Sequence, residues 1–234
     1  MNLQGNRLTF LGHAAFRIET KDGATVYVDP WVSNPLCPEN EKDVKKCDAI
    51  ICTHGHGDHI GDVARIARQH NPVVVGIFEL CTWLQKKGVQ QIAPMNKGGT
   101  QTVAGVGVTM VHALHSSGAQ EDDGSAVYAG EACGYVLELP GGVRLYHAGD
   151  TMVFGDMQII HEVYAPEIAL LPIGGHFTMG PQEAAYACKL LRPKTVIPMH
   201  FGTFPMLTGT PAELKRLLGP GGPEVVEMKP GQTI

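Results

Sequence analysis

Residues 47–62 read CDAIICTHGHGDHIGD, and this stretch decides how the rest of the chain is interpreted. Its first part, Ala49 to Cys52, is a short apolar run rich in β-branched side chains, which predicts a buried strand. A helical pattern of apolar residues begins after Gly61. The polar residues between these two elements therefore lie in a tight turn at the C-terminal end of a strand. Open α/β sheets usually place their chemistry there.

The turn is rich in side chains that bind metal ions. Gly55 and Gly57 separate them, and we expect these glycines to let the backbone fold sharply, so that several side chains point one way. An isolated histidine is usually structural or solvated, but three histidines and an aspartate in one short turn indicate a metal site. Imidazole and carboxylate together suit zinc, manganese, iron or nickel. The four candidate ligands are His54, His56, Asp58 and His59.

The composition is that of an ordinary globular protein with ample apolar material for a core. The chain has 234 residues, of which 44% are hydrophobic and 18% charged, and its formal net charge is -5. The acidic balance and the lack of a basic cluster argue against a nucleic-acid partner. No apolar run is long enough for a membrane span, and the N-terminus does not resemble a signal peptide. We expect a cytoplasmic protein with a small-molecule substrate, and the sequence leaves a homo-oligomer open.

Six cysteines are scattered along the chain without a CxxC pair. Cys52 and Cys188 lie in apolar patterns, which predicts buried thiols. Cys37 and Cys47 flank a proline-containing loop and could pair, but without an export signal we expect reduced cysteines throughout.

Short strands and helices alternate along the chain. No linker separates its halves, so residues 1–234 are expected to form one domain with two sheet layers covered by helices. The expected strands are 8–11, 15–19, 25–28, 49–52, 73–75, 101–103, 106–114, 135–139, 143–146, 168–171, 195–198 and 224–227. The expected helices are 61–69, 78–87, 157–163, 181–191 and 211–218. An Asp-Gly pair at 22–23 predicts a hairpin turn between the second and third strands.

Three further polar residues follow expected strands, each with glycine or serine nearby. They are His115 after the strand 106–114, Asp150 in the sequence HAGD, and His200 in PMHFG. Four ligands in one turn cannot satisfy a metal pair alone, so these three residues are candidates to complete it.

Together these motifs resemble the metallo-β-lactamase superfamily. THGHGDH, LGHAAF, VDPW, HAGDT, LPIGGHFTMGP and PMHFGTFP are similar to the branch of metal-dependent hydrolases related to L-ascorbate-6-phosphate lactonase, from His13 to Pro205. The resemblance implies an α/β fold, an αββα sandwich of two mixed β-sheets flanked by helices, with the site along one edge of both sheets.

The resemblance also implies roles for individual residues. His54, His56 and His115 would hold one metal ion, Asp58, His59 and His200 would hold a second, and Asp150 would bridge both. His112 lies three residues before His115 and is the alternative third ligand. His115 is preferred because His112 falls within the alternating strand pattern.

A dinuclear centre of this kind predicts hydrolysis. Two divalent ions about 4 Å apart lower the pKa of a shared water toward about 7 and polarise a substrate oxygen. Zinc or manganese fits best, with iron or nickel as further candidates. Asp58 would act as a ligand, or as a base if only one metal binds. The expected substrate is a small ester, lactone or phosphoester. The alternatives are a phosphodiesterase on cyclic nucleotide or nucleic acid, a di-iron redox protein, or a non-enzymatic metallo-sensor.

Several other residues keep two interpretations. Asp29 forms either a turn before Pro30 or an acceptor that orients a ligand histidine. His13 faces either the metal cleft or the backbone. His147 is expected to pack or support its turn, and contact with the substrate is the alternative. His176, in GGHFT, is a candidate substrate contact or proton donor.

Residues 116–132 are polar, rich in glycine and without clear periodicity. We expect a mobile loop beside the site that stays out of the core and governs substrate choice. If Glu121, Asp122 and Asp123 face the cleft, they disfavour highly anionic substrates.

Overall fold

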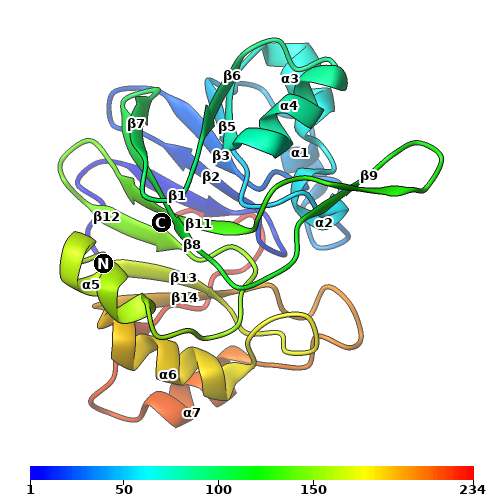
Figure 1. Ribbon diagram of the computed structural model, residues 1–234. Helices are drawn as coiled ribbons and strands as arrows, with labels where there is room; N and C mark the ends of the chain where they lie inside the picture. Colours follow the sequence, from blue (N-terminus) through cyan, green and yellow to red (C-terminus); the bar gives the residue numbers. More distant parts are fainter.

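The first of two large sheets contains most of the N-terminal half of the chain, as Figure 1 shows for the computed structural model of residues 1–234. Strands β1 to β3 pair antiparallel, and β3 to β6 pair parallel. The turn between β2 and β3 contains Gly23 at a φ of 90°, a conformation that favours glycine. In sheet order, the strands are β1 (Arg7–Phe10), β2 (Phe16–Glu19), β3 (Thr25–Val28), β4 (Ala49–Ile51), β5 (Val73–Ile77) and β6 (Ile92–Met95).

The second sheet contains seven strands from the rest of the chain. Strands β7, β8, β11 and β12 pair antiparallel, and β12 to β15 pair parallel. In sheet order, its strands are β15 (Glu224–Val225), β14 (Thr195–Met199), β13 (Ile168–Pro172), β12 (Arg144–His147), β11 (Cys133–Glu138), β8 (Val106–His112) and β7 (Thr100–Val103). A separate two-stranded ribbon is formed by β9 (Gly118–Gln120) and β10 (Ala126–Tyr128).

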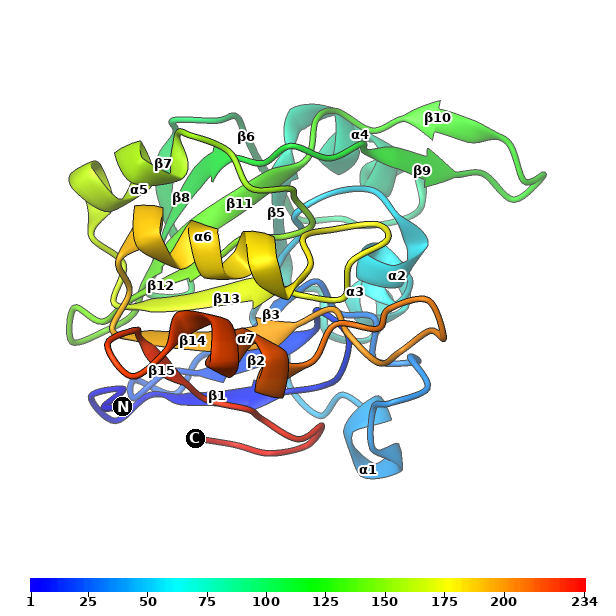
Figure 2. The same ribbon diagram turned by 90° about the horizontal axis from the view of Figure 1, so that it is seen from below.

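Helices cover the outer faces of both sheets. α3 (Val63–His70) and α4 (Phe78–Lys86) lie over the first sheet, whereas α5 (Met157–Tyr164), α6 (Pro181–Leu191) and α7 (Pro211–Leu218) lie over the second, as Figures 1 and 2 show. α6 and α7 both begin at a proline, where the missing N–H costs little. The arrangement confirms the expected αββα sandwich of two mixed sheets.

The main core lies between the two sheets. β-branched and aromatic side chains from both sheets are buried there, and the hydroxyl of Tyr135 on β11 donates to the carbonyl oxygen of Cys52 at 2.9 Å. This hydrogen bond ties the second sheet to the end of β4, where the histidine-rich turn begins. No helix of the protein combines the length and the apolar character that a membrane crossing requires.

The strand directions place several loops at one edge of the sandwich. β3, β4, β12, β13 and β14 run parallel within their sheets, and β8 runs the same way as β12 because both pair antiparallel with β11. Their C-terminal ends lead into loops on the right in Figures 1 and 2, beside the short helix α2 (Gly57–Ile60). This edge contains every ligand predicted from the sequence.

The structure corrects the expected elements in three places. β6 was not predicted because it contains Pro94, and it lies at the edge of its sheet, where a missing N–H is tolerated. The expected helix 61–69 corresponds to α3, which begins at Val63, and the short helix α2 lies before it, in the stretch that was expected to be a turn. A further short helix, α1 (Glu39–Lys42), lies in the loop after β3.

The expectation for residues 116–132 is also wrong in part. The segment forms the β9–β10 ribbon, and Ala119, Ala129 and Ala132 are buried. Turn chemistry explains the hairpin, since Asp123 accepts from the backbone N–H of Ser125 at 2.9 Å and Gly124 has a φ of 84°. Periodicity could not reveal it because each strand has only three residues.

Candidate metal centre

The histidine-rich turn joins β4 to α2. Thr53 and His54 are fully buried, and α2 starts directly after His56. Neither Gly55 nor Gly57 has a positive φ, so the prediction that the turn needs their backbone freedom is wrong. Gly55 is required for another reason: a Cβ atom at this position would lie 2.8 Å from the Cβ of Ala129, beside the ribbon. The glycine therefore lets the ribbon approach the turn closely.

Two groups of potential ligands lie side by side at this edge. Within each group, the ligand atoms are all less than 4.8 Å apart. The first group contains His54, His56 and His115, and the second contains His13, Asp58, His59 and His200. These groups match the two ligand sets that the resemblance implies, with His13 as an addition.

Asp150 lies between the two groups. Its Oδ2 atom is 3.8 Å from Nε2 of His54 and 3.5 Å from Nε2 of His115, which belong to the first group. The same oxygen is 3.1 Å from Nε2 of His200, and Oδ1 is 3.3 Å from Nε2 of His59, both in the second group. One carboxylate therefore faces ring nitrogens of both groups.

The buried polar atoms at the centre fit a metal ion. His59 Nε2, Asp150 Oδ1 and His200 Nε2 are buried without a hydrogen-bond partner. Such orphaned atoms are costly in a folded protein unless a ligand satisfies them. All three converge on one region, and imidazole nitrogen and carboxylate oxygen are ligands of zinc and manganese. The donor set therefore suits divalent cations of this type.

Asp29 fixes the orientation of two candidate ligands. Its Oδ2 atom lies 2.8 Å from Nδ1 of His59 and 2.6 Å from the hydroxyl of Thr53, which donates to it. Because that hydroxyl proton is used, the Thr53 oxygen accepts from Nδ1 of His54 at 3.0 Å. Both histidines then carry a proton on Nδ1 and direct Nε2 toward the other candidate ligands. Of the two interpretations of Asp29, the structure favours the acceptor that orients ligands.

His13 connects the ligands of the second group. Its ring is fully buried, with Nε2 3.0 Å from Oδ2 of Asp58 and Nδ1 2.9 Å from the hydroxyl of Thr203. Its carbonyl oxygen accepts from the backbone N–H of His200 at 2.7 Å. The φ of His13 is 55°, a left-handed conformation that non-glycine residues rarely adopt. His13 therefore faces the cleft with its ring and satisfies the backbone with its carbonyl.

His147 supports the turn that carries Asp150. Its Nδ1 atom accepts from the backbone N–H of Gly149 at 3.2 Å, and Nε2 donates to the carbonyl of Ala14 at 3.1 Å. Gly149 has a φ of 62°, and a Cβ there would lie 2.7 Å from the Cys133 carbonyl oxygen. The supporting role expected for His147 agrees with these contacts.

Burial keeps the histidines of the first group neutral. It lowers the pKa of His54 well below its ordinary value and lowers the pKa of His56 and His115 in the same direction. Burial also lowers the pKa of His13 to about 4, despite the nearby Asp58. These four rings are therefore neutral at pH 7.

In the second group, the charges of nearby carboxylates outweigh burial and raise the pKa of two histidines. Burial lowers the pKa of His200, but the charges of Asp150 and Asp58 outweigh this effect and raise it to about 9. Asp150 and Asp29 likewise outweigh burial at His59 and raise its pKa. Burial favours the neutral form of Asp150, yet His59 and His200 hold its pKa well below the usual range. Excess negative charge at this position is what a cation would neutralise.

Two predicted or alternative residues lie outside the cluster. His112 is on β8, where its Nδ1 atom lies 2.9 Å from Nζ of Lys97, and its ring packs edge-on against Phe154. The structure therefore brings His115, and not His112, to the centre. His176 is exposed on the loop after β13, and its ring packs edge-on against Phe177.

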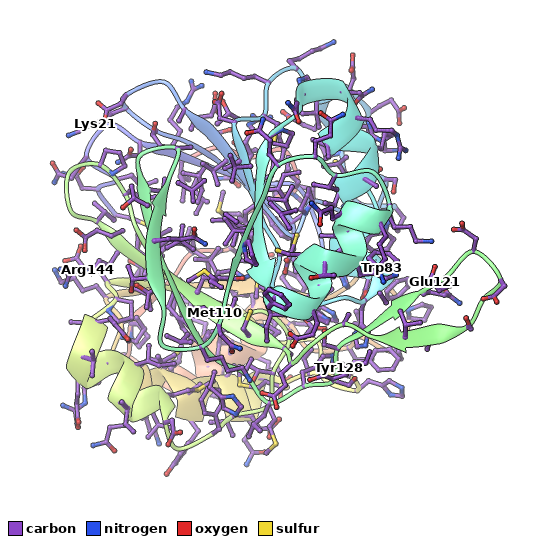
Figure 3. All side chains as sticks on the ribbon, turned by 45° about the horizontal axis from the view of Figure 1, so that its top comes forward. Lys21, Trp83, Met110, Glu121, Tyr128 and Arg144 are labelled. Atoms are coloured by element: carbon purple, nitrogen blue, oxygen red, sulfur yellow. The ribbon has the colours of Figure 1, made fainter.

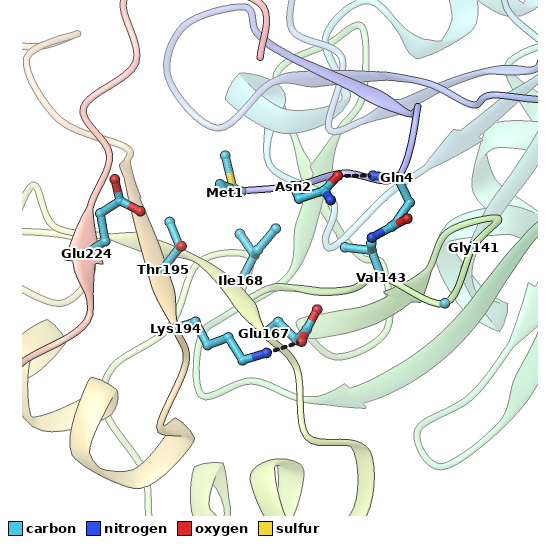
Figure 4. Close-up of a pocket in the computed structure, with 11 residues that line it drawn as sticks. Met1, Asn2, Gln4, Gly141, Val143, Glu167, Ile168, Lys194, Thr195 and Glu224 are labelled. Atoms are coloured by element: carbon cyan, nitrogen blue, oxygen red, sulfur yellow. Dashed lines mark hydrogen bonds and ion pairs between the residues drawn. The ribbon is translucent and has the colours of Figure 1, made fainter.

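An open cavity adjoins the first ligand group. It has a volume of about 530 Å³ and lies between the cluster and the ribbon. Its lining includes His56, His115, Ser116, Val127 and Tyr128. Another cavity, of about 460 Å³, lies at the opposite edge of the second sheet (Figure 4), where Glu167 pairs with Lys194 at 2.5 Å. Only the first of these two cavities is placed to admit a substrate to the candidate metal centre.

Sequence reasoning missed the contributions of Thr53 and Thr203, and it left His13 and Asp29 open. Thr53 could have been found from its position directly before the ligand run. Thr203 carries no such signal because its contact with His13 joins residues that are far apart in the sequence.

Comparison with known proteins identifies relatives along the whole chain. A model of the β-lactamase superfamily domain matches residues 24–201. A UPF0173 metal-dependent hydrolase of Koribacter versatilis is 59% identical over 234 residues, covering 100% of this chain and 99% of the relative. Another from Rubrobacter xylanophilus is 48% identical over 235 residues, covering 99% and 97%.

A solved structure supports the same relationship. Igni18, described as a novel metallo hydrolase from the hyperthermophilic archaeon Ignicoccus hospitalis, is 40% identical to this chain. The two structures superimpose with a TM-score of 0.87 over 98% of this chain and 97% of Igni18.

Proposed function

The chain belongs to the β-lactamase superfamily and is a metal-dependent hydrolase, and we propose that it uses two divalent metal ions to hydrolyse a small ester, lactone or phosphoester. The family predicted from the sequence motifs is confirmed by these relatives. The number of metal ions, their identity and the substrate class are our proposal. Zinc or manganese fits the ligand types best.

The position of Asp150 carries the proposal of a dinuclear centre. Its two carboxylate oxygens face one pair of histidines in each ligand group, and Oδ1 has no hydrogen-bond partner. A carboxylate is suited to bridge two cations because each oxygen has lone pairs to offer. In the proposed centre, His54, His56 and His115 hold one ion, Asp58, His59 and His200 hold the other, and Asp150 joins them.

Metal ions at these positions would supply a hydroxide nucleophile near neutral pH and polarise a substrate oxygen. The protein's own residues prepare the site for this chemistry. Asp29 and Thr53 present Nε2 of His54 and His59 toward the centre, and His13 holds the carboxylate of Asp58. The sharp turn after β12, held by His147, fixes Asp150 between the groups.

His176 retains its proposed role as a substrate contact or proton donor. It lies on the loop after β13, at the same edge as the cluster, and its imidazole is exposed. His176→Gln should lower kcat/KM and leave the metal content unchanged. Unchanged kinetics on every substrate would remove this residue from the site.

Metal analysis combined with a substrate panel tests the proposal. Protein purified without nickel or chelator is saturated with zinc or manganese, desalted and examined by elemental analysis, which should approach two equivalents per chain. The same preparation is assayed with chromogenic esters, lactones and phosphodiesters before and after chelation. A persistent single equivalent with full activity would exclude the dinuclear mechanism, and activity that resists chelation would exclude the metal-dependent one.

A further inference from the structure

Half of the large apolar side chains exposed on the protein belong to segments around the candidate metal centre. Each is between 42% and 71% exposed. Tyr128 lies on the ribbon, and Leu114 is the residue directly before His115. Met152, Phe177 and Met206 lie on the loops after β12, β13 and β14. We call this set the apolar rim: Leu114, Tyr128, Met152, Phe177 and Met206.

Backbone hydrogen bonds join the loops of the rim into one layer. Met152 donates to the carbonyl of Leu114 at 3.2 Å, which joins the loop of Asp150 to that of His115. Met179 donates to Thr151 at 3.0 Å, which adds the loop after β13. Gly209 donates to Gly174 at 3.3 Å, which adds the loop after β14. The loops that carry Leu114, Met152, Phe177 and Met206 are therefore hydrogen-bonded to one another beside the ligand groups.

These loops also lack cationic side chains. Residues 113–118, 148–155, 173–180 and 200–210 contain no lysine or arginine, and Asp150 is their only carboxylate. Lys97, which contacts His112, is paired with Glu131 at 2.6 Å. A phosphate or carboxylate group on the substrate would therefore find no lysine or arginine on these loops to bind.

The lining of the cavity next to the first ligand group also contains apolar side chains and no lysine or arginine. Tyr128 and Val127 of the ribbon form one wall, and the hydroxyl of Ser116 lies 3.4 Å from Nε2 of His56. Figure 3 shows Tyr128 on the ribbon, on the opposite side of the molecule from Lys21 and Arg144. A cavity of about 530 Å³ suits a small apolar group rather than a macromolecular surface.

We propose that the substrate is an uncharged ester or lactone whose apolar acyl or alkyl group lies against the apolar rim. This inference rests on the proposed hydrolytic function and narrows its substrate class by excluding phosphoesters. In the reaction, water adds across the acyl C–O bond. Its hydroxyl goes to the acyl carbon and its proton to the leaving oxygen, giving a carboxylic acid and an alcohol.

Chain-length dependence tests the role of the rim. Metal-loaded protein is assayed with p-nitrophenyl esters from acetate to octanoate, with the anionic hemisuccinate ester and with bis-p-nitrophenyl phosphate. We expect kcat/KM to rise about two- to fourfold for each added methylene until the rim is covered. The hemisuccinate and the phosphodiester should be poorer substrates than the neutral ester of similar length.

A matched pair of variants assigns this preference to the rim. Phe177 and Tyr186 are both aromatic and both 54% exposed, but Tyr186 lies on α6, away from the centre. Phe177→Ser should flatten the chain-length dependence, whereas Tyr186→Ser should keep the wild-type dependence. Calorimetric binding of acetohydroxamate and octanohydroxamate gives a readout without turnover, and octanohydroxamate should lose its advantage in Phe177→Ser.

The results of these assays distinguish failure of the rim proposal from failure of the proposed hydrolytic function. A flat chain-length profile with good ester turnover would overturn the rim proposal and leave the proposed function in place. Preference for the hemisuccinate or the phosphodiester would overturn it as well. If neither the esters nor the phosphodiester are hydrolysed, the proposed function fails. Equal binding of both hydroxamates would overturn the rim proposal alone. A wild-type dimer that Phe177→Ser dissociates would show that a second copy covers this surface, which again overturns the proposal.

Discussion

The Oδ2 atom of Asp29 lies 2.8 Å from Nδ1 of His59, and both side chains are completely buried. The same oxygen accepts from the hydroxyl of Thr53, which in turn accepts from His54. One carboxylate therefore fixes the tautomer of a histidine in each ligand group. Such outer partners of metal ligands raise ligand basicity and hold the ring in place.

We expect Asp29→Asn to weaken metal binding about 10- to 100-fold. Both carboxylate oxygens of Asp29 accept hydrogen bonds from Thr53 or His59, and the NH2 group of asparagine, which only donates, cannot replace either of them. Competitive titration with a fluorescent zinc chelator measures the affinity. Thr53→Val should weaken binding at the first group alone, since it breaks only the path to His54, and Thr53→Ser should restore the wild-type value. Wild-type affinity in folded Asp29→Asn would show that the carboxylate is dispensable.

Asp150→Ala and His112→Ala should differ sharply. Asp150 faces both ligand groups, whereas His112 contacts Lys97 and Phe154 outside them. Asp150→Ala should lower kcat by more than about 100-fold, beyond the usual effect of an outer partner. His112→Ala should retain both metal ions and near wild-type kcat, with a stability change of about 0.5 kcal/mol or less, as for most surface substitutions. Equal losses in the two folded variants would contradict the ligand assignment.

Much of the fold could be predicted because its elements carry local signals. The turn of residues 47–62, the paired prolines that begin α6 and α7, and the Asp-Gly hairpin each specify their structure within a few residues. β6 escaped prediction because it contains Pro94, and the β9–β10 ribbon escaped it because three-residue strands are too short to show a periodicity.

In the candidate site too, some residues could be predicted from local sequence and others could not. Its ligands are recognisable because metal binding demands particular residue types after strands. The contacts of His13 with Asp58 and Thr203 depend instead on how three loops meet, as does the position of Asp29 beneath His59. Such partners can be identified only when the tertiary structure brings the segments together.

Metal binding should depend on pH in a direction set by the second group. The charges of Asp150 and Asp58 raise the pKa of His200 to about 9, and Asp150 and Asp29 raise the pKa of His59, so the second group holds protons more tightly than the first. A metal ion must displace these protons, whereas the first group, with lowered pKa values, is already neutral.

Affinity at the second group should therefore rise between about pH 6.5 and 9, by about tenfold per unit for each proton displaced. Affinity at the first group should stay nearly constant over this range. Activity should fall below about pH 6, because protons then compete for the imidazole ligands and the attacking water is not deprotonated. Calorimetry in buffers of different ionisation enthalpy counts the released protons. A proton count of zero at pH 7, or a flat activity profile to about pH 4.5 with saturating metal, would refute the prediction.

The ribbon is anchored to α4 by Glu121. Its carboxylate accepts from Nε1 of Trp83 at 2.7 Å and pairs with Nζ of Lys87 at 2.6 Å, and Figure 3 shows Glu121 and Trp83 on the same side of the molecule. The condition under which Glu121 would disfavour anionic substrates, that it faces the cleft, is therefore not met, since its carboxylate pairs with α4. Glu121 acts on the site by holding the ribbon whose Tyr128 lines the cavity beside His56.

We expect Glu121→Ala to loosen the ribbon and raise KM about two- to threefold, a modest change because an exposed ion pair contributes little. Metal content should stay at the wild-type value, since no ligand is touched, and the fluorescence of Trp83 should shift as its indole N–H loses its acceptor. Asp122→Ala is the matched control. Its side chain is 99% exposed, and its carboxylate lies 3.4 Å from Nζ of Lys87, farther than the carboxylate of Glu121. This variant should change neither KM nor fluorescence. Equal effects of the two variants would mean that net charge, and not the anchor on α4, controls access to the cavity. An unchanged KM in Glu121→Ala together with a clear fluorescence shift would mean that the ribbon moves freely without influencing substrate binding.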